Sequence, residues 1–302
     1  MMPAPNKNVC IALGLMIVFI AQSAVVYADR RVTDQLGRTI TFPDNPKRIV
    51  SMAPNITEIM YALNQQHRLV GATLFSDYPP EAEEIPKVGS YVHLDIERIV
   101  ALQPDLCFAT KDGNPIEVVG MLDSMDIPVY AVNPRNLDTV MKTLLEIGAL
   151  LNAEANAQRV VSQMKKRIQR VTKRVAHADS RPKVFCQIGI NPIVSAGTDT
   201  CIHELIEMAG GKNIAEGPVP YPRFSREQIL SLAPDIFIIT SMARGAVFES
   251  VQSDWKKFPS IPAVRNHRIM LVNSNILDRP TPRLVDGLEM LARIIHPVIF
   301  KE

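Results

Sequence analysis

The sequence lacks an excess of charge of either sign. Lys and Arg together number 33 and Asp and Glu together 31, which gives a formal net charge of +2. A surface with so little net charge has no strong field toward nucleic acid or anionic lipid, so the sequence argues against both classes of partner. The chain is 47% apolar and 21% charged, a composition typical of a folded globular protein.

Cysteine is also scarce. Cys10 lies in an apolar N-terminal run, which leaves Cys107, Cys186 and Cys201 in the rest of the chain. An odd number of cysteines cannot form a complete disulfide framework. Cys107 and Cys186 lie in apolar stretches, where a buried thiol behaves as a small hydrophobic side chain. We predict structural thiols, and whether two of the three form one disulfide stays open.

Catalytic motifs are absent: the chain has no HExxH, CxxC, GxSxG or P-loop, and no GxGxxG after a strand. Asp77, His93 or Asp278 could act as an acid or base in an enzyme, but no nucleophile lies beside a base partner in the sequence. The histidines are dispersed and lack metal-ligand spacing: His67, His93, His177, His203, His267 and His296. The sequence predicts a protein that is not an enzyme, with no metal site and no catalytic cofactor.

The first 28 residues have the pattern of a secretory signal peptide. They contain one charged residue, Lys7, followed by a nonpolar run from Val9 to Ala21 and a small residue, Ala28. The run is shorter than the roughly 20 apolar residues that a membrane span needs. We therefore predict cleavage after Ala28 and a mature protein outside the cytoplasm.

Short apolar strands alternate with helical patterns through most of the remaining chain. A hairpin is predicted on both sides of Leu36-Gly37, in RRVTDQLGRTITF. The strands KRIVSM, LVGAT, LCFAT and PVYAV follow, and KVFCQIGI, DIFIIT and RIMLVNS repeat the plan in the second half. Strands that alternate with helices in this way predict an α/β fold with parallel, doubly wound sheets. We place an N-terminal lobe at 29–135 and a C-terminal lobe at 181–302.

Between the lobes, residues 136–180 are predicted to form a helical connection. The stretch 154–177 contains no Gly or Pro. Its apolar residues are spaced three or four apart, as in an amphipathic helix: Val160, Val161, Met164, Ile168, Val171 and Val175. A helix of this length spans about 35 Å, enough to brace two lobes against a wide hinge motion.

One segment occurs twice. ERIVALQPDLCFAT begins at Glu97, and EQILSLAPDIFIIT begins at Glu227. Each glutamate lies in the first turn of a predicted helix, where the helix dipole stabilises a carboxylate by roughly 0.3 to 1 kcal/mol. Helix capping by Asp95 and Ser225 would explain one copy. Two matching carboxylates on two matching lobes also favour a docking surface for a basic partner.

The motifs together carry a family resemblance. KRIVSMAPNITEIMYAL, SDYPPEAEEIPKVGSY, DIERIVALQPDL, INPIVSAG, YPRFSREQIL and RPTPRLVDGLEML resemble the periplasmic solute-binding proteins of ABC importers for cobalamin, siderophores and haem. The run FSDYPPEAEEIPKVGSY, with IGINP and SREQ, is most similar to the cobalamin-binding members. The resemblance covers nearly all of the predicted mature chain.

The resemblance implies a fold and a function. The expected fold is two Rossmann-like α/β lobes with parallel sheets joined by one long α-helix. The expected protein is a periplasmic monomer that captures cobalamin, vitamin B12, as a transported ligand and delivers it to an ABC permease dimer with its ATPase subunits. Glu97 and Glu227 would engage arginines on the two permease subunits. An iron siderophore or haem is the alternative ligand.

The resemblance also implies the residues of the ligand cleft. A corrin is a broad, largely apolar disc with amides at its rim, so its receptor needs aromatic walls and a few polar donors. The positions that match the family's cleft are Tyr78, Tyr91, Asn191, Tyr221, Asn275 and Arg279. Arg279 could instead pair with a carboxylate of haem or of a siderophore. The chain departs from the cobalamin-binding pattern at Ile193 and Val194, which stand in place of an aromatic residue.

Overall fold

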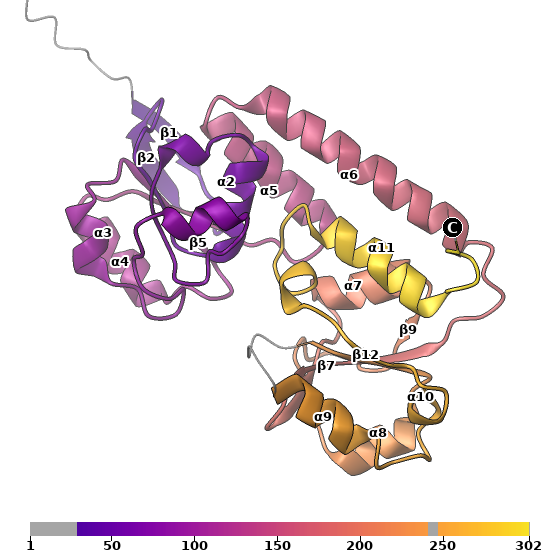
Figure 1. The fold of residues 1–302 in the computed structure, drawn as a ribbon. Coiled ribbons are helices and arrows are strands. Elements are labelled where there is room, and N and C mark those ends of the chain that lie inside the picture. The colour runs from indigo at the N-terminus through magenta and orange to yellow at the C-terminus, as the bar shows by residue number, and fades with distance from the viewer. Residues whose placement is uncertain (1–28, 241–246, 302) are drawn as a thin grey trace, which may run out of the picture.

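The computed structural model describes residues 29–240 and 247–301, and the predicted signal peptide, residues 1–28, lies outside the described residues. Figure 1 shows two α/β lobes with the long helix α6 (Glu154–Val175) running from one to the other. The prediction of two α/β lobes joined by one long helix is therefore confirmed.

The N-terminal lobe is built on a parallel sheet with the strand order β4-β3-β5-β6. A separate antiparallel hairpin, β1 with β2, precedes it, as the alternation around Leu36-Gly37 predicts. The elements are β1 (Asp29–Thr33), β2 (Thr39–Pro43), β3 (Ile49–Ser51), α2 (Pro54–Ala62), η1 (Gln66–Arg68), β4 (Leu69–Ala72), η2 (Pro80–Glu84), α3 (Ile96–Ala101), β5 (Leu106–Thr110), α4 (Ile116–Ser124) and β6 (Val129–Val132).

The C-terminal lobe contains a mixed sheet with the strand order β10-β8-β7-β11-β12, and β9 also pairs with β7. Helix α5 (Leu137–Leu150) precedes α6 on the way to this lobe. The elements of the lobe are β7 (Lys183–Gly189), β8 (Ile193–Ser195), α7 (Cys201–Met208), β9 (Lys212–Asn213), β10 (Arg223–Phe224), α8 (Arg226–Leu232), β11 (Ile236–Ile239), α9 (Val247–Trp255), α10 (Pro262–Arg265), β12 (Ile269–Leu271), η3 (Ser274–Ile276) and α11 (Leu284–Ile295).

The expectation of a parallel sheet is wrong at one edge of the C-terminal lobe. Strands β7, β9, β11 and β12 are parallel, whereas β8 pairs antiparallel with β7 and β10 pairs antiparallel with β8. Only residues 190–192 connect β7 to β8. A parallel crossover needs a dozen or more residues, so a connection this short forces a hairpin.

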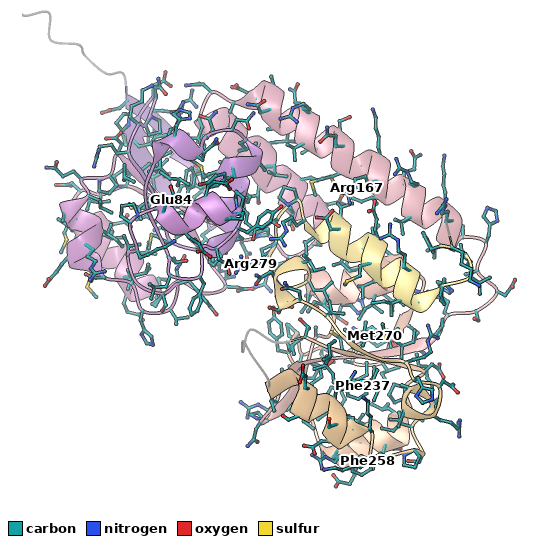
Figure 2. The ribbon with its side chains drawn as sticks, viewed as in Figure 1. Glu84, Arg167, Phe237, Phe258, Met270 and Arg279 are labelled. Carbon is teal, nitrogen blue, oxygen red and sulfur yellow. The ribbon has the colours of Figure 1, made fainter. Side chains whose placement is uncertain are left out.

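Both central strands place alternate side chains in different cores, which is the signature of a sheet covered on both faces. In β5, Leu106 and Phe108 pack with α2 and α5, while Cys107 and Ala109 pack with α3 and α4. In β11, Ile238 packs with α7 and α11, and Phe237 packs with α8 and α9. Figure 2 shows Phe237 within the lower lobe, on the side of its sheet that faces α8 and α9.

Helix α6 gives the two lobes a common core. Its buried side chains belong to the same apolar cluster as the α2 and α5 face of the first lobe and the α7 and α11 face of the second. Near its start, the Asn156 amide donates to the Leu63 carbonyl oxygen at 3.0 Å. Farther along, Arg167 pairs with Asp286 and Glu289 of α11, and Figure 2 shows Arg167 between the two helices. The helix is therefore attached to both lobes.

The repeated segment performs the same structural task in each lobe. Its Pro-Asp aspartate accepts hydrogen bonds at the start of the neighbouring strand: Asp105 Oδ2 from the Arg48 amide at 2.8 Å, and Asp235 Oδ2 from the Lys183 amide at 2.8 Å. The basic side chains of the same residues form the reverse contact: Arg48 donates to the Leu102 carbonyl oxygen, and Lys183 donates to the Leu232 carbonyl oxygen. Part of the repeat is thus explained by how a helix is joined to a parallel strand.

Candidate functional site

A cavity of about 1140 Å³ lies between the two lobes. Its walls come from the start of α2 and the loops after β5 and β6 on one side, and from the start of α7 and the segment after β12 on the other. Ligands of open α/β sheets bind outside the carboxyl ends of the parallel strands, where these loops emerge. The volume is slightly above the roughly 300 to 1,000 Å³ of most small-molecule sites.

The walls of the cavity combine aromatic and aliphatic side chains with polar ones. Phe75 and Tyr91 form one wall in the N-terminal lobe, with ring centroids 5.9 Å apart in an edge-to-face arrangement. Tyr221 and Leu271 line the cavity from the C-terminal lobe, and Tyr221 remains 51% exposed. Large apolar surface is therefore left open on both sides, which suits a wide and flat ligand.

Asn114 organises the N-terminal wall. Its amide nitrogen donates to the carbonyl oxygens of Met52 and Tyr91, each at 2.8 Å, and its Oδ1 accepts from the Thr110 amide at 2.7 Å. One side chain thereby joins the end of β3, the end of β5 and the Tyr91 loop. No sequence motif indicates this role, because two of the three partners, Met52 and Tyr91, are 62 and 23 residues away along the chain.

Two titratable side chains, Asp278 and Cys201, belong to the C-terminal wall. Asp278 lines the cavity and is half-buried, and burial of its carboxyl raises the pKa of that group to about 7 although Arg279 opposes the shift. No described residue forms a hydrogen bond with its Oδ1. Cys201 lies at the start of α7, and burial raises the pKa of its thiol to about 12. That thiol is protonated at neutral pH and has little nucleophilic character.

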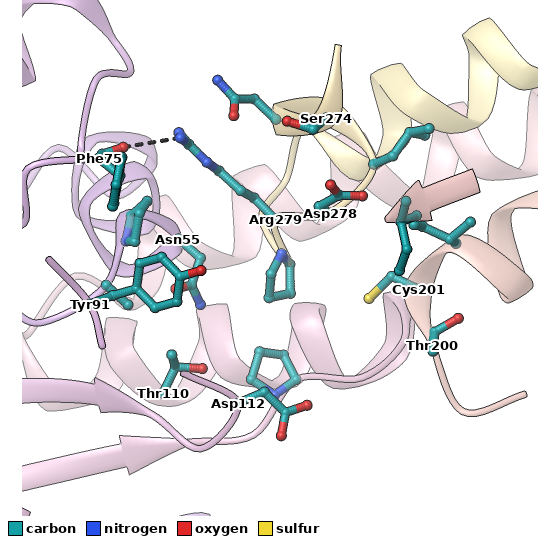
Figure 3. Close-up of a pocket in the computed structure, with 18 of the residues that line it drawn as sticks. Asn55, Phe75, Tyr91, Thr110, Asp112, Thr200, Cys201, Ser274, Asp278 and Arg279 are labelled. Atoms are coloured by element: carbon teal, nitrogen blue, oxygen red, sulfur yellow. Dashed lines mark hydrogen bonds between the residues drawn. The ribbon is translucent and has the colours of Figure 1, made fainter. Parts of the chain in front are cut away.

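A cluster of ion pairs joins the two lobes beside the cavity. Arg279 Nη1 lies 2.9 Å from Glu58 Oε1 and 2.8 Å from Asp77 Oδ1, and Nη2 donates to the Phe75 carbonyl oxygen at 3.0 Å. Figure 3 shows this last bond, with Arg279 reaching from the C-terminal segment to the Phe75 loop. Arg283 adds a second pair with Glu58 at 3.3 Å. Burial raises the pKa of Glu58, and the two arginines act against that shift.

Four of the six predicted cleft residues line the cavity: Tyr91, Asn275, Tyr221 and Arg279. Tyr78 and Asn191 are not among its lining residues. The Arg283 guanidinium lies 3.6 Å from the centroid of the Tyr78 ring, so Tyr78 belongs to the contact between the lobes. Asn191 lies in the exposed turn between β7 and β8.

Sequence reasoning missed other lining residues, including Asn55, Phe75 and Arg135. Arg135 pairs with Asp112 at 3.2 Å within the N-terminal lobe. For Asp278, the sequence indicates only a candidate acid or base. Phe75 and Arg135 follow β4 and β6, so their positions just after strands were the signal that could have found them.

The matching glutamates are exposed at the first turns of α3 and α8. Asp95 caps α3 by accepting from the Arg98 amide at 3.1 Å, and Ser225 caps α8 by accepting from the Gln228 amide at 3.2 Å. The caps predicted from the sequence are thus confirmed, and Glu97 and Glu227 remain exposed beside them. In Figure 1, α3 and α8 lie on the sides of their sheets that face away from α6. The helix backbone and Ser225 lower the pKa of Glu227.

Within residues 29–240 and 247–301, no group of three or more His, Cys, Asp or Glu side chains is arranged to hold a metal ion. In the same part of the chain, no helix is both long and apolar enough to cross a membrane.

Comparisons with known proteins agree with this architecture. Residues 49–276 match the family described as periplasmic binding protein. An ABC transporter substrate-binding lipoprotein, YvrC of Bacillus subtilis, is 31% identical over 90% of this chain and 87% of its own. A vitamin B12-binding protein of Vibrio cholerae serotype O1 is 32% identical over 82% of this chain and 89% of its own.

Two solved structures show the same fold. The periplasmic vitamin B12 binding protein BtuF of Vibrio cholerae has a TM-score of 0.73 at 28% identity and covers 85% of this chain and 99% of its own. The periplasmic heme-binding protein RhuT of Roseiflexus sp. RS-1 has a TM-score of 0.75 at 25% identity, with coverage of 84% and 99%.

The raised pKa of the Asp278 carboxyl predicts a pH dependence of stability. Its pKa of about 7 lies above the ordinary value of 3.8, so the folded protein binds this proton more tightly than the unfolded chain. The stabilisation is complete below about pH 4 and is lost as the pH rises through 7. Asp278→Asn should therefore raise the free energy of unfolding at pH 8 by roughly 1 to 3 kcal/mol more than at pH 4.5.

Urea denaturation at the two pH values measures this difference. Asp199→Asn is the control, because Asp199 lines the same cavity but is exposed. An equal effect of Asp278→Asn at both pH values would contradict the prediction.

Proposed function

The chain belongs to the periplasmic binding protein family, and on this basis we propose that it is the solute-binding subunit of an ABC importer for cobalamin or a related corrinoid. The observation that carries the proposal is the cavity of about 1140 Å³ between two lobes, walled by aromatic and aliphatic side chains from both. Such a cleft can hold a broad apolar disc between its walls. The proposal involves capture and release of the ligand without covalent chemistry.

The relatives named vitamin B12-binding proteins support the choice of ligand. The ion pairs of Arg279 also support a corrinoid over haem as the ligand. A ligand that relied on carboxylates, such as haem, would benefit from a cation in the cleft that is free to pair. Arg279 is instead held by Glu58 and Asp77. Amides, by contrast, need only hydrogen-bonding groups, which the polar side chains Asn55, Thr110 and Asn275 in the lining offer.

We further propose a route for the ligand. The signal peptide is cleaved after Ala28, and the lobes at 29–135 and 181–302 act as a periplasmic monomer. Glu97 and Glu227 each engage a basic residue on one subunit of the permease dimer, whose ATPase subunits drive transport. Their exposure on α3 and α8 supports this role, because Asp95 and Ser225 already cap the two helices.

Calorimetric titration with cyanocobalamin tests the proposal. We expect one ligand per chain, and hemin serves as the comparison ligand under the same conditions. Binding of hemin without binding of cyanocobalamin would replace the corrinoid with haem and keep the importer role. Absence of binding by both would leave the ligand as an iron siderophore or another solute.

Tyr221 is expected to contribute to the affinity. Tyr221→Ala removes part of the apolar wall and should raise the Kd for cyanocobalamin about ten- to a hundredfold, which corresponds to roughly 1.4 to 2.8 kcal/mol of buried aromatic surface. Tyr61→Ala is the matched control, because Tyr61 lies on α2 outside the cavity lining. An unchanged Kd for Tyr221→Ala would remove this residue from the ligand site.

The docking role of the glutamates predicts a separation of transport from binding. Glu97→Lys with Glu227→Lys should abolish transport into proteoliposomes that contain the permease, because two attractive contacts become repulsive. The Kd for the ligand should not change. Glu117→Lys is the control, since Glu117 also lies exposed in the first turn of a helix, α4. Loss of affinity in the double variant, or transport at the normal rate, would rule out the docking role.

A further inference from the structure

The contact between the lobes beside the cavity is made by charged groups with defined directions. Glu58 on α2 and Asp77 in the loop after β4 come from the N-terminal lobe, and Arg279 and Arg283 come from the segment between β12 and α11. The cluster contains two carboxylates and two guanidinium groups, so its formal charges balance. Figure 2 shows Arg279 in the space between the lobes.

These ion pairs are shielded from solvent. The side chains of Arg279, Glu58 and Asp77 are 12%, 3% and 16% exposed. Water strongly weakens the attraction within surface ion pairs, whereas a buried pair retains it. An arrangement that leaves one buried charge without its partner has a much higher free energy. A small separation of the lobes would strand charges in a site with little water. The cluster therefore favours one distance between the lobes.

The geometry of the guanidinium groups also restricts the relative orientation of the lobes. Arg279 uses Nη1 for two carboxylates and Nη2 for the Phe75 carbonyl, and Phe75 is itself part of the cavity wall. Arg283 pairs with Glu58 and also stacks on the Tyr78 ring. A planar, multidentate donor tolerates less displacement than an apolar contact, which can slide.

Three members of the cluster, Glu58, Asp77 and Arg283, are not among the residues that line the cavity. We propose that Glu58, Asp77, Arg279 and Arg283 form a lock between the lobes, which fixes the width of the cleft before the ligand arrives. They are positioning residues, and they act on the ligand through the separation of its two walls. The inference rests on the proposed function in taking a corrinoid as the ligand whose binding depends on that width.

The width of the cleft can be measured without any ligand. Nitroxide labels at Glu117→Cys and Lys256→Cys report the distance between the lobes by pulsed electron paramagnetic resonance, since both positions are exposed and lie in different lobes. A Cys201→Ser background is used because Cys201 is the one cysteine among the described residues that is not buried. The unaltered lock should give one narrow distance distribution that cyanocobalamin does not shift.

Asp77→Asn and Arg283→Gln test the lock from its two sides. Each should broaden the distance distribution of the free protein, and added cyanocobalamin should narrow it again. The Kd should rise about tenfold through a slower apparent association, because the competent width is then populated about one tenth of the time. The dissociation rate should stay unchanged. Loss of a direct ligand contact would instead speed dissociation and leave the distances as they were.

Arg135→Gln is the matched control for the distances, because its pair with Asp112 lies within one lobe. Distributions for Asp77→Asn and Arg283→Gln as narrow as that of Arg135→Gln would overturn the lock, as would a broad distribution in the unaltered protein. If either variant fails to fold, as judged by circular dichroism, the other decides the question. Failure of cyanocobalamin to bind the unaltered protein would overturn the proposed ligand alone, since the ligand-free distances still decide the lock.

Discussion

The structure depends on the burial of one helix against two lobes. The apolar stripe of α6 is covered partly by α2 and α5 and partly by α7 and α11, so removing either lobe would expose part of it. The hydrophobic effect that folds each lobe therefore also joins them. On the C-terminal side, the ion pairs of Arg167 with α11 also fix how α6 is oriented against that helix. A cleft between lobes joined in this way has a shape set largely by folding.

Arg279 shows how a residue can match a ligand-binding pattern and still have a different principal partner. It lines the cavity, as the family resemblance implies, but its guanidinium is engaged by Glu58, Asp77 and the Phe75 carbonyl. Its charge is balanced by the opposite lobe. Arg279 is thus part of the cleft wall and also part of the contact that sets the distance between the lobes.

The repeated segment serves two purposes that occupy different residues. The Pro-Asp pair and the basic residue at the start of the neighbouring strand join helix to sheet, identically in both lobes. That joint explains the aspartates but not Glu97 and Glu227, which lie exposed in the first turns of helices capped by Asp95 and Ser225.

The sequence by itself determined the fold class, the long helix and the repeat, because these follow from local periodicity and capping. It also indicated Tyr91, Tyr221, Asn275 and Arg279 as cavity residues through their motifs. Only the tertiary structure decided that Tyr78 packs under Arg283, that Asn191 lies in a hairpin turn, and that Asn114 ties three segments together. The antiparallel edge of the second sheet was missed although the short β7-β8 connection required it. Partners more than 200 residues apart, such as Glu58 and Arg279, leave no periodic signal in the chain, since their pairing depends on how two completed lobes meet.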